Sequence, residues 1–127
     1  MRKIEREMIQ AIIELKGKPD SFWNRYQGWS KANTLVRRGR NDVTNPCSEV
    51  YLHGNHIATY TDDGHLYINH CGWKTNTTKS RLNALISFVH GGLSGIYQKN
   101  FEWYMKRVSN SDGSVYEYPI PNAWLLV

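Results

Sequence analysis

The sequence predicts an α+β fold: an antiparallel sheet, made of a central three-stranded meander plus C-terminal strands, packed with an N-terminal helix and a second helix at about residues 78–90. Two observations carry this expectation. Apolar residues recur at helical spacing in two separate segments, and two short turn signals divide the alternating segment between them. We expect a single domain over residues 1–127, because a chain of this length buries about two thirds of its unfolded surface in one core.

The N-terminal segment, residues 2–16, has the pattern of an amphipathic helix. Its apolar side chains recur every three or four residues, at Ile4, Met8, Ile12 and Leu15. Gly17 and Pro19 end the pattern. We expect the apolar face to pack on the sheet; a dimer seam is the alternative. Residues 21–28 are aromatic and irregular, and residues 33–37 have the composition of a short strand.

The centre of the chain has the pattern of a meander. Gly54-Asn55 and Asp63-Gly64 are two-residue turn signals between alternating segments. Turns at these positions place Leu52 opposite Ile57. The expected core face carries Val50, Leu52, Ile57, Thr59, Thr61, Leu66 and Ile68. The expected opposite face carries Tyr51, His53, His56, Ala58, Tyr60, His65, Tyr67 and Asn69.

The C-terminal third begins with the second helix. Its apolar stripe consists of Leu82, Leu85, Ile86 and Val89, and Gly91-Gly92 ends it. Residues 96–108 alternate with period two, as in a strand, and residues 110–114 turn the chain into a last strand at 115–119. Pro119 confines that strand to a sheet edge, because proline donates no backbone hydrogen bond.

Positive charge is concentrated near the start of the chain. The net charge is +5, and the first 40 residues hold ten Lys and Arg against four acids. Such asymmetry favours a polyanionic partner or an acidic protein surface. Apolar residues make up 40% of the chain, yet no apolar run approaches the ~20 residues of a membrane span. We therefore expect a globular protein with no membrane partner, present as a monomer or a homodimer.

The start of the second helix carries cations where acids are usual. A helix N-terminus holds roughly half a positive elementary charge and four unpaired N–H groups, so it attracts anions. The segment instead supplies basic and hydroxyl side chains: Lys74, Thr77, Thr78, Lys79 and Arg81. We predict that these residues bind phosphate groups. The alternative is a Thr77 or Thr78 helix cap surrounded by solvated lysines.

Two further groups extend the predicted site. Arg37, Arg38 and Arg40 would continue the phosphate track, since no acid lies among them. Tyr51, Tyr60 and Tyr67 share the predicted second face of the meander, where they would stack with bases or serve as an interface. The alternative is that another part of the chain covers this face.

The sequence gives no sign of an enzyme, a metal site or a cofactor. It has no phosphate-binding glycine loop, no nucleophile elbow and no zinc-binding pattern. The predicted register separates Cys47 and Cys71 by about 20 Å, far beyond the roughly 4.4–6.8 Å between Cα atoms in a disulfide. We expect two free thiols, and no catalysis.

Three segments resemble a known group of proteins. They are VYLHGNHIA at residues 50–58, GWxTxTTKSRLNAL at residues 72–85 and YQKNFEWY at residues 97–104. In this order they resemble small uncharacterised proteins of tailed bacteriophages, of the marine cyanophage type. The resemblance covers roughly residues 47–105 and implies a phage product that acts in the host cytoplasm. It implies no site residues.

These observations lead to two expectations of function. The first is a phage accessory protein that binds the phosphate backbone of DNA or RNA without catalysis. The second is an anti-defence or host-takeover inhibitor, such as an anti-CRISPR protein, that blocks a host protein or nucleoprotein surface. Aromatic residues of the interface hot-spot type support the second expectation. A structural virion component is a weaker third reading.

Overall fold

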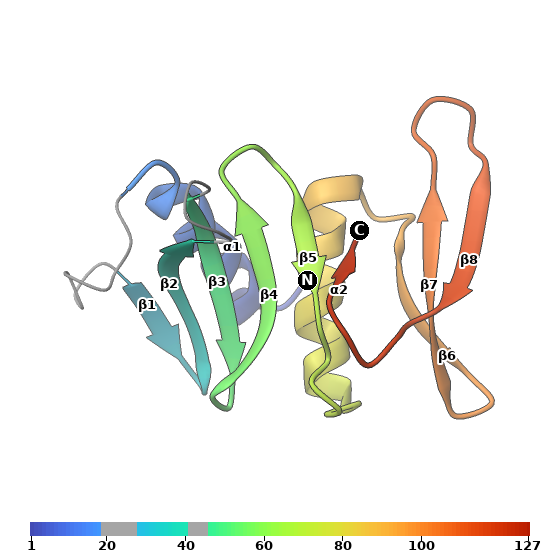
Figure 1. Cartoon of the computed structure of the whole chain (residues 1–127), viewed down its shortest axis with the longest axis horizontal. Coiled ribbons are helices and arrows are strands. Elements are labelled where there is room, and N and C mark those ends of the chain that lie inside the picture. The colour runs from blue at the N-terminus through green and yellow to red at the C-terminus, as the bar shows by residue number, and fades with distance from the viewer. Residues whose placement is uncertain (19–27, 41–45) are drawn as a thin grey trace.

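The α+β prediction is confirmed by a computed structural model that describes residues 1–18, 28–40 and 46–127. Within these residues it contains two helices and nine strands, arranged in two antiparallel sheets (Figure 1). The helices are α1 (Lys3–Leu15) and α2 (Asn76–His90). None of the described helices is long and apolar enough to cross a membrane.

The larger sheet has six strands in the order β1-β2-β3-β4-β5-β9. Its strands are β1 (Gly28–Lys31), β2 (Thr34–Arg40), β3 (Pro46–Leu52), β4 (Asn55–Thr61), β5 (Leu66–Ile68) and β9 (Leu125–Leu126). The meander forms its centre, and α1 packs against β2 as expected for its apolar stripe. The C-terminal residues return to pair with β5, which the sequence analysis did not predict.

The smaller sheet contains β6 (Gly95–Lys99), β7 (Glu102–Val108) and β8 (Val115–Pro119), in that order. The single strand predicted over residues 96–108 is wrong, because Asn100 and Phe101 adopt φ values of 53° and 66° and form a two-residue hairpin turn. β8 lies at an edge, as Pro119 requires. This sheet projects on the far side of α2 from the larger sheet (Figure 1).

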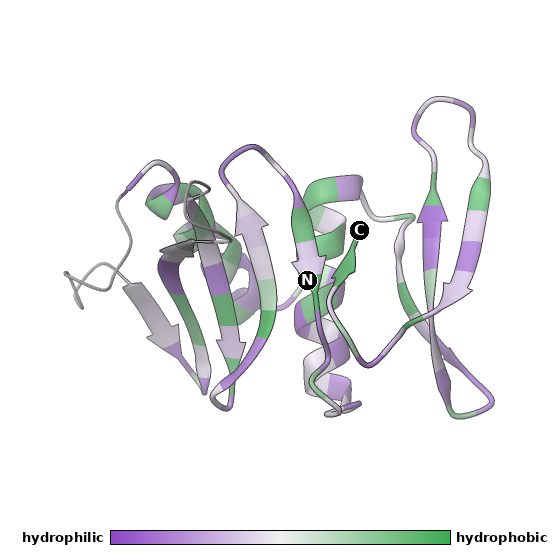
Figure 2. Cartoon of the chain, in the orientation of Figure 1, coloured by the Kyte–Doolittle hydropathy of each residue, from purple (hydrophilic) through white to green (hydrophobic). Residues whose placement is uncertain are grey.

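The core lies between the helices and the sheets. Met8 and Ile12 of α1 and Leu82 and Leu85 of α2 are each at most 1% exposed. From the smaller sheet, Ile96, Trp103 and Met105 join the same cluster. Hydrophobic segments accordingly follow the strands and helices, whereas the loop between β4 and β5 is hydrophilic (Figure 2). α2 is therefore in contact with both sheets and holds them together.

The predicted register of the meander is wrong at its first turn. The two loop residues are His53 and Gly54, with φ values of 50° and 80°, instead of Gly54 and Asn55. A type I′ turn needs positive φ at both central positions and favours glycine at the second, which explains the shift. A β-bulge follows at Ile57. Tyr51 pairs with His56 but Val50 pairs with Ala58, so Ile57 has no partner in β3, and the Ile57 side chain remains buried.

This bulge exchanges residues between the two faces of the sheet. Ala58 and Tyr60 move to the helix-covered face, because they pair with Val50 and Ser48. Thr59 and Thr61 move to the opposite face, and Thr59 pairs with Tyr67 there instead of with Ile68. At the second turn Thr61 lies opposite His65 around a three-residue loop, instead of opposite Leu66.

Candidate functional site

α2 begins two residues earlier than predicted. Thr75 is its N-cap, and the Thr75 Oγ1 accepts a hydrogen bond from the Thr78 backbone N–H at 3.2 Å. The first turn carries no acid, as expected. Thr78 is 2% exposed and its hydroxyl bonds to that of Thr75. Lys74 is exposed and lies 3.7 Å from Glu102. The helix start therefore has its own cap, so it does not depend on an external anion.

Arg81 serves the structure of the core. Its guanidinium is buried and donates to the Glu5 carboxylate at 2.8 Å and to the Thr34 hydroxyl at 3.1 Å. Glu5, also buried, accepts further hydrogen bonds from the Ser80 hydroxyl and the Arg2 backbone N–H. The pair links α2, α1 and β2. Because both partners are buried and satisfied, we leave Arg81 out of the candidate site.

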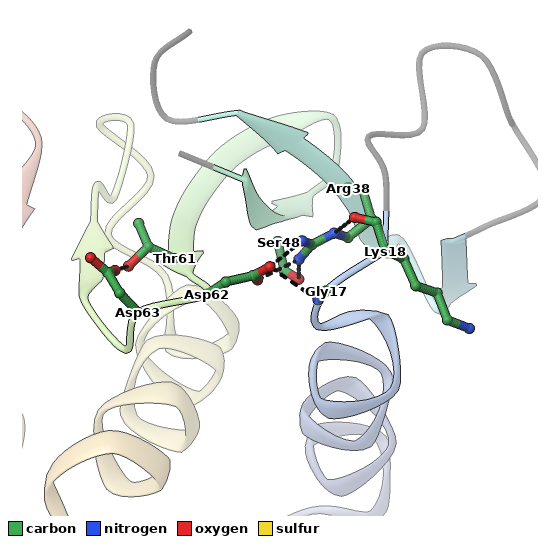
Figure 3. A network of polar contacts seen from close by, with 7 residues as sticks. All are labelled: Gly17, Lys18, Arg38, Ser48, Thr61, Asp62 and Asp63. Carbon is green, nitrogen blue, oxygen red and sulfur yellow. Dashed lines mark hydrogen bonds and ion pairs between the residues drawn. The ribbon is translucent and has the colours of Figure 1, made fainter. Parts of the chain in front are cut away.

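Arg38 has a similar structural role. Its side chain is fully buried and donates two hydrogen bonds to the Asp62 carboxylate, at 2.9 and 2.7 Å, and others to Ser48 and the Lys18 carbonyl (Figure 3). Burial alone would raise the pKa of Asp62, but the hydrogen bonds from Arg38 and the Gly17 N–H outweigh it and lower the pKa. The side chain of Arg40 lies outside the described residues.

Arg37 and Tyr51 belong to a row of stacked side chains on the face of the larger sheet away from the helices. The Arg37 guanidinium lies 4.7 Å from the centre of the Tyr51 ring and donates to Glu49 at 3.0 Å. The His56 ring stacks on Tyr51 at 4.7 Å, with Trp124 at its edge. β2 and β4 flank β3, so both faces of the Tyr51 ring are covered. This row leaves Tyr51 no free face for a base.

The other two tyrosines of the predicted stacking group are separated from each other. Tyr60 faces the helices, where its ring packs against Phe88 of α2 at 5.5 Å. Tyr67 lies on the opposite face, paired with Leu126 of β9. The three tyrosines therefore do not form one surface. The bulge in β4 is the cause, because it reverses the side on which Tyr60 lies.

A polar groove of about 730 Å³ runs beside α2. It is lined by three basic side chains: Arg2 before α1, Lys79 on α2 and Lys106 on β7. Among the residues that the structure describes, none of the three forms an ion pair within 4.0 Å. The one acid in its wall, Glu5, is already bonded to Arg81. The groove therefore carries an excess of positive charge.

Two features of α2 and β6 shape the groove floor. The Asn83 amide donates to the Ile96 carbonyl at 3.1 Å and accepts from the Ile96 N–H at 2.6 Å, which fastens β6 to α2. Gly95, beside Ile96, pairs with Lys106 across the sheet. A Cβ atom at Gly95 would lie only 2.9 Å from the Asn83 Oδ1. The glycine thus allows the close approach of the strand to the helix.

An aromatic pair borders the groove. Tyr97 of β6 lines it, and its ring stacks on that of Tyr104 of β7 at 5.6 Å. The Tyr97 hydroxyl donates to Glu117 at 2.8 Å, and this hydrogen bond to a carboxylate raises the pKa of Tyr97. Since β6 is the edge strand of its sheet, Tyr104 covers the Tyr97 ring from one side only. The other side of the ring faces the groove.

A second hollow, of about 360 Å³, lies at the start of α2. The turn after β3 and the residues before the helix enclose it, and Trp73, 58% exposed, forms part of its wall. Thr75 and Thr77 also line it. Lys74 is absent from this wall, and Lys79 lies in the larger groove. The predicted phosphate-binding residues are therefore divided between two places.

The described residues contain no cluster of three or more metal-ligating side chains. Cys47 and Cys71 are free thiols, as predicted. Burial raises the pKa of Cys47 to about 11, so this thiol is protonated and unreactive at neutral pH.

The fold and the groove define an α+β protein with a cationic groove between its second helix and its smaller sheet. The chain belongs to the Kyanoviridae Gp96 protein family, whose model matches residues 1–120. This confirms the predicted origin in a tailed phage of the cyanophage type, and it includes the first 46 residues, which the resemblance did not cover. No match was found among the curated proteins or the solved structures.

Arg2, Lys106 and Tyr97 line the groove but were not predicted as site residues from the sequence. Arg2 is distant in sequence from α2, and the packing of α1 on α2, with the ion pair between Glu5 and Arg81, brings it to the groove. Lys106 and Tyr97 were assigned to one long strand. A turn at Asn100-Phe101 places both on one face of a hairpin, but this pair lacks the glycine that usually marks such a turn.

Proposed function

We propose that this phage protein binds nucleic acid through its phosphate backbone, in the host cytoplasm and without catalysis. The observation that carries the proposal is the groove beside α2, where Arg2, Lys79 and Lys106 form no ion pair within 4.0 Å among the described residues, although Glu117 lies opposite Lys106 in the sheet. Phosphate oxygens would supply the missing counter-charge. Lys79 is the one residue of the predicted helix-start site that this groove retains.

The size and polarity of the groove support a phosphate ligand. Two uncharged polar side chains of α2, those of Asn76 and Ser87, line this groove. Such side chains commonly donate hydrogen bonds to phosphate and sugar oxygens. Contacts of this kind carry no base sequence information. We therefore expect binding with strong salt dependence and little sequence preference.

The test is fluorescence anisotropy with labelled DNA and RNA at about 50 and 200 mM salt. Lys79→Glu/Lys106→Glu should weaken binding at least tenfold and reduce the salt slope by about 1.4 for a single strand, at ~0.7 per phosphate contact. The matched control, Lys16→Glu/Lys31→Glu, lowers the net charge equally at exposed positions outside the groove. Equal weakening by both double variants would contradict the proposed site.

A second candidate function is inhibition of a host protein by surface contact. The observation that favours it is Trp73, an exposed tryptophan beside the 360 Å³ hollow at the start of α2. Tryptophan is enriched among residues that dominate interface energies. Capture of one host protein that survives nuclease treatment and is lost in Trp73→Ser would support this candidate. Loss of all captured proteins on nuclease treatment would favour the first.

A further inference from the structure

We infer that the nucleic acid is single-stranded and that its bases stack on Tyr97, at the β6 edge, and on Phe101, in the β6–β7 turn. This inference rests on the proposed function, since the groove supplies the phosphate contacts. It concerns the three-stranded sheet, one surface of which carries Tyr97, Tyr104, Lys99 and Lys106 together with two acids, Glu102 and Glu117.

The first observation is the arrangement of side chains across β6 and β7. Cross-strand pairs share a face, so Tyr97 and Tyr104 lie on the same side of the sheet as Lys106 and the Lys99–Glu102 pair. From Gly95 to Lys99 this surface extends about 13 Å, at ~3.3 Å per residue. A strand of nucleic acid leaving the groove along β6 would thus meet aromatic rings and then a further lysine.

The second observation is the conformation of Phe101. It lies at the tip of the β6–β7 hairpin, 90% exposed, with a φ of 66°. Type I′ turns strongly favour glycine at this second central position, because a side chain is strained there. Phe101 therefore combines backbone strain with full exposure of an apolar ring. Neither property stabilises the fold, and strained residues of this kind cluster at ligand sites.

The third observation is that the aromatic surface has accessible ring faces. Tyr104 covers Tyr97 from one side only, and Phe101 has no described ring contact. Bases of a duplex are already stacked inside the helix and cannot reach these rings. Unpaired bases can, and stacking on aromatic side chains tolerates any base. The surface therefore favours a single strand over a duplex.

The experiment compares a single strand with the duplex of the same sequence, in Phe101→Gly, Tyr97→Leu and the control Tyr116→Leu. Tyr116 is exposed in the same sheet but pairs with Arg107 on the opposite face. We expect the wild type to bind the single strand at least tenfold more tightly. Phe101→Gly should weaken that binding roughly 5- to 100-fold. It should also raise the midpoint of thermal unfolding, since glycine relieves the strain.

Each alternative result has a distinct meaning. Equal affinity for single strand and duplex, with both lost in Lys79→Glu/Lys106→Glu, would overturn the stacking inference and leave the proposed function standing. Unchanged single-strand affinity in Phe101→Gly and Tyr97→Leu would overturn the inference too. An absence of binding to any nucleic acid at about 50 mM salt would overturn both.

Discussion

The two sheets each carry an aromatic row next to basic residues, but only the smaller sheet leaves its groups available. On the larger sheet, Tyr51 is covered on both sides by Arg37 and His56, and Arg37 is paired with Glu49. On the smaller sheet, Tyr97 is covered on one side, and Lys106 has no ion pair among the described residues. The tyrosine and the basic residue of the larger sheet are therefore covered on both sides or paired by other side chains of the protein, whereas, among the described residues, those of the smaller sheet are not. What separates them is whether the protein supplies their partners.

The basic residues differ in the same way. Arg38 and Arg81 are buried and bonded to Asp62 and Glu5, whereas Lys79 lies in the groove only two residues before Arg81 on the same helix. Burial of a charge is tolerated only when a partner and hydrogen bonds compensate for lost hydration. Arginine suits this position because its planar group makes several hydrogen bonds at once.

The largest effect on stability is expected on α2, when Arg81 and Lys79 are replaced separately. Arg81→Met should lower the free energy of unfolding by about 3–5 kcal/mol, because it leaves the Glu5 carboxylate buried and unpaired. Lys79→Met should change it by no more than about 0.5 kcal/mol, as expected for a surface side chain. Urea denaturation measures both values.

Since a loss of this size can unfold a marginally stable protein, a compensated variant serves as control. Glu5→Leu/Arg81→Met replaces both charges by apolar groups and should recover most of the lost stability. Equal effects of Arg81→Met and Lys79→Met would contradict the division into structural and available cations.

A smaller effect is expected from pH. Burial lowers the pKa of His56, and nearby Arg37 lowers it further although Glu49 opposes both. Between the lowered value and about 6.5, the unfolded chain binds more protons than the folded one, so the free energy of unfolding falls as pH drops through this window. One proton contributes at most ~1.4 kcal/mol per pH unit. Denaturation curves across this range measure the slope.

His56→Gln should reduce that slope without abolishing it, because burial and Lys74 also lower the pKa of His70. A slope unchanged in His56→Gln would show that the stacked row of the larger sheet does not depend on neutral His56. Nucleic-acid affinity should not follow the same profile, since no histidine lines the groove.

The smallest effect is expected at Arg37. Arg37→Gln removes a half-exposed ion pair with Glu49 and a contact over the Tyr51 ring, together worth up to about 1 kcal/mol of unfolding free energy. Nucleic-acid affinity should stay within twofold of the wild type. A loss of affinity as large as that of Lys79→Glu/Lys106→Glu would move the binding site to the larger sheet.

Local patterns in the sequence predicted the fold well. The helices follow from apolar periodicity, and the meander and the edge position of β8 follow from turn residues and Pro119. The faces of the meander could not be predicted, since a single bulge near Ile57 reverses Tyr60. The β6–β7 hairpin was missed because Asn100-Phe101 lacks the glycine that usually marks such a turn.

The candidate site was less predictable than the fold. Lys79 was identified from its place at the helix start, but Arg2 and Lys106 reach the groove only through tertiary packing. Arg81 was assigned to phosphate because its partner, Glu5, lies 76 residues away in the sequence. Basic residues near a helix N-terminus therefore indicate a candidate anion site. Which of them can bind an external anion depends on whether an acid distant in the sequence already pairs with them in the fold.

The most direct test of the central claim is a titration of the isotopically labelled protein with a short single-stranded oligonucleotide, followed by backbone amide chemical shifts. We expect shifts to concentrate at Lys79, Gly95–Tyr97, Phe101 and Lys106, while the amides of Arg37, Tyr51 and His56 stay unchanged. Shifts concentrated on β2, β3 and β4 instead would contradict it, because the stacked row of the larger sheet would then be the binding surface.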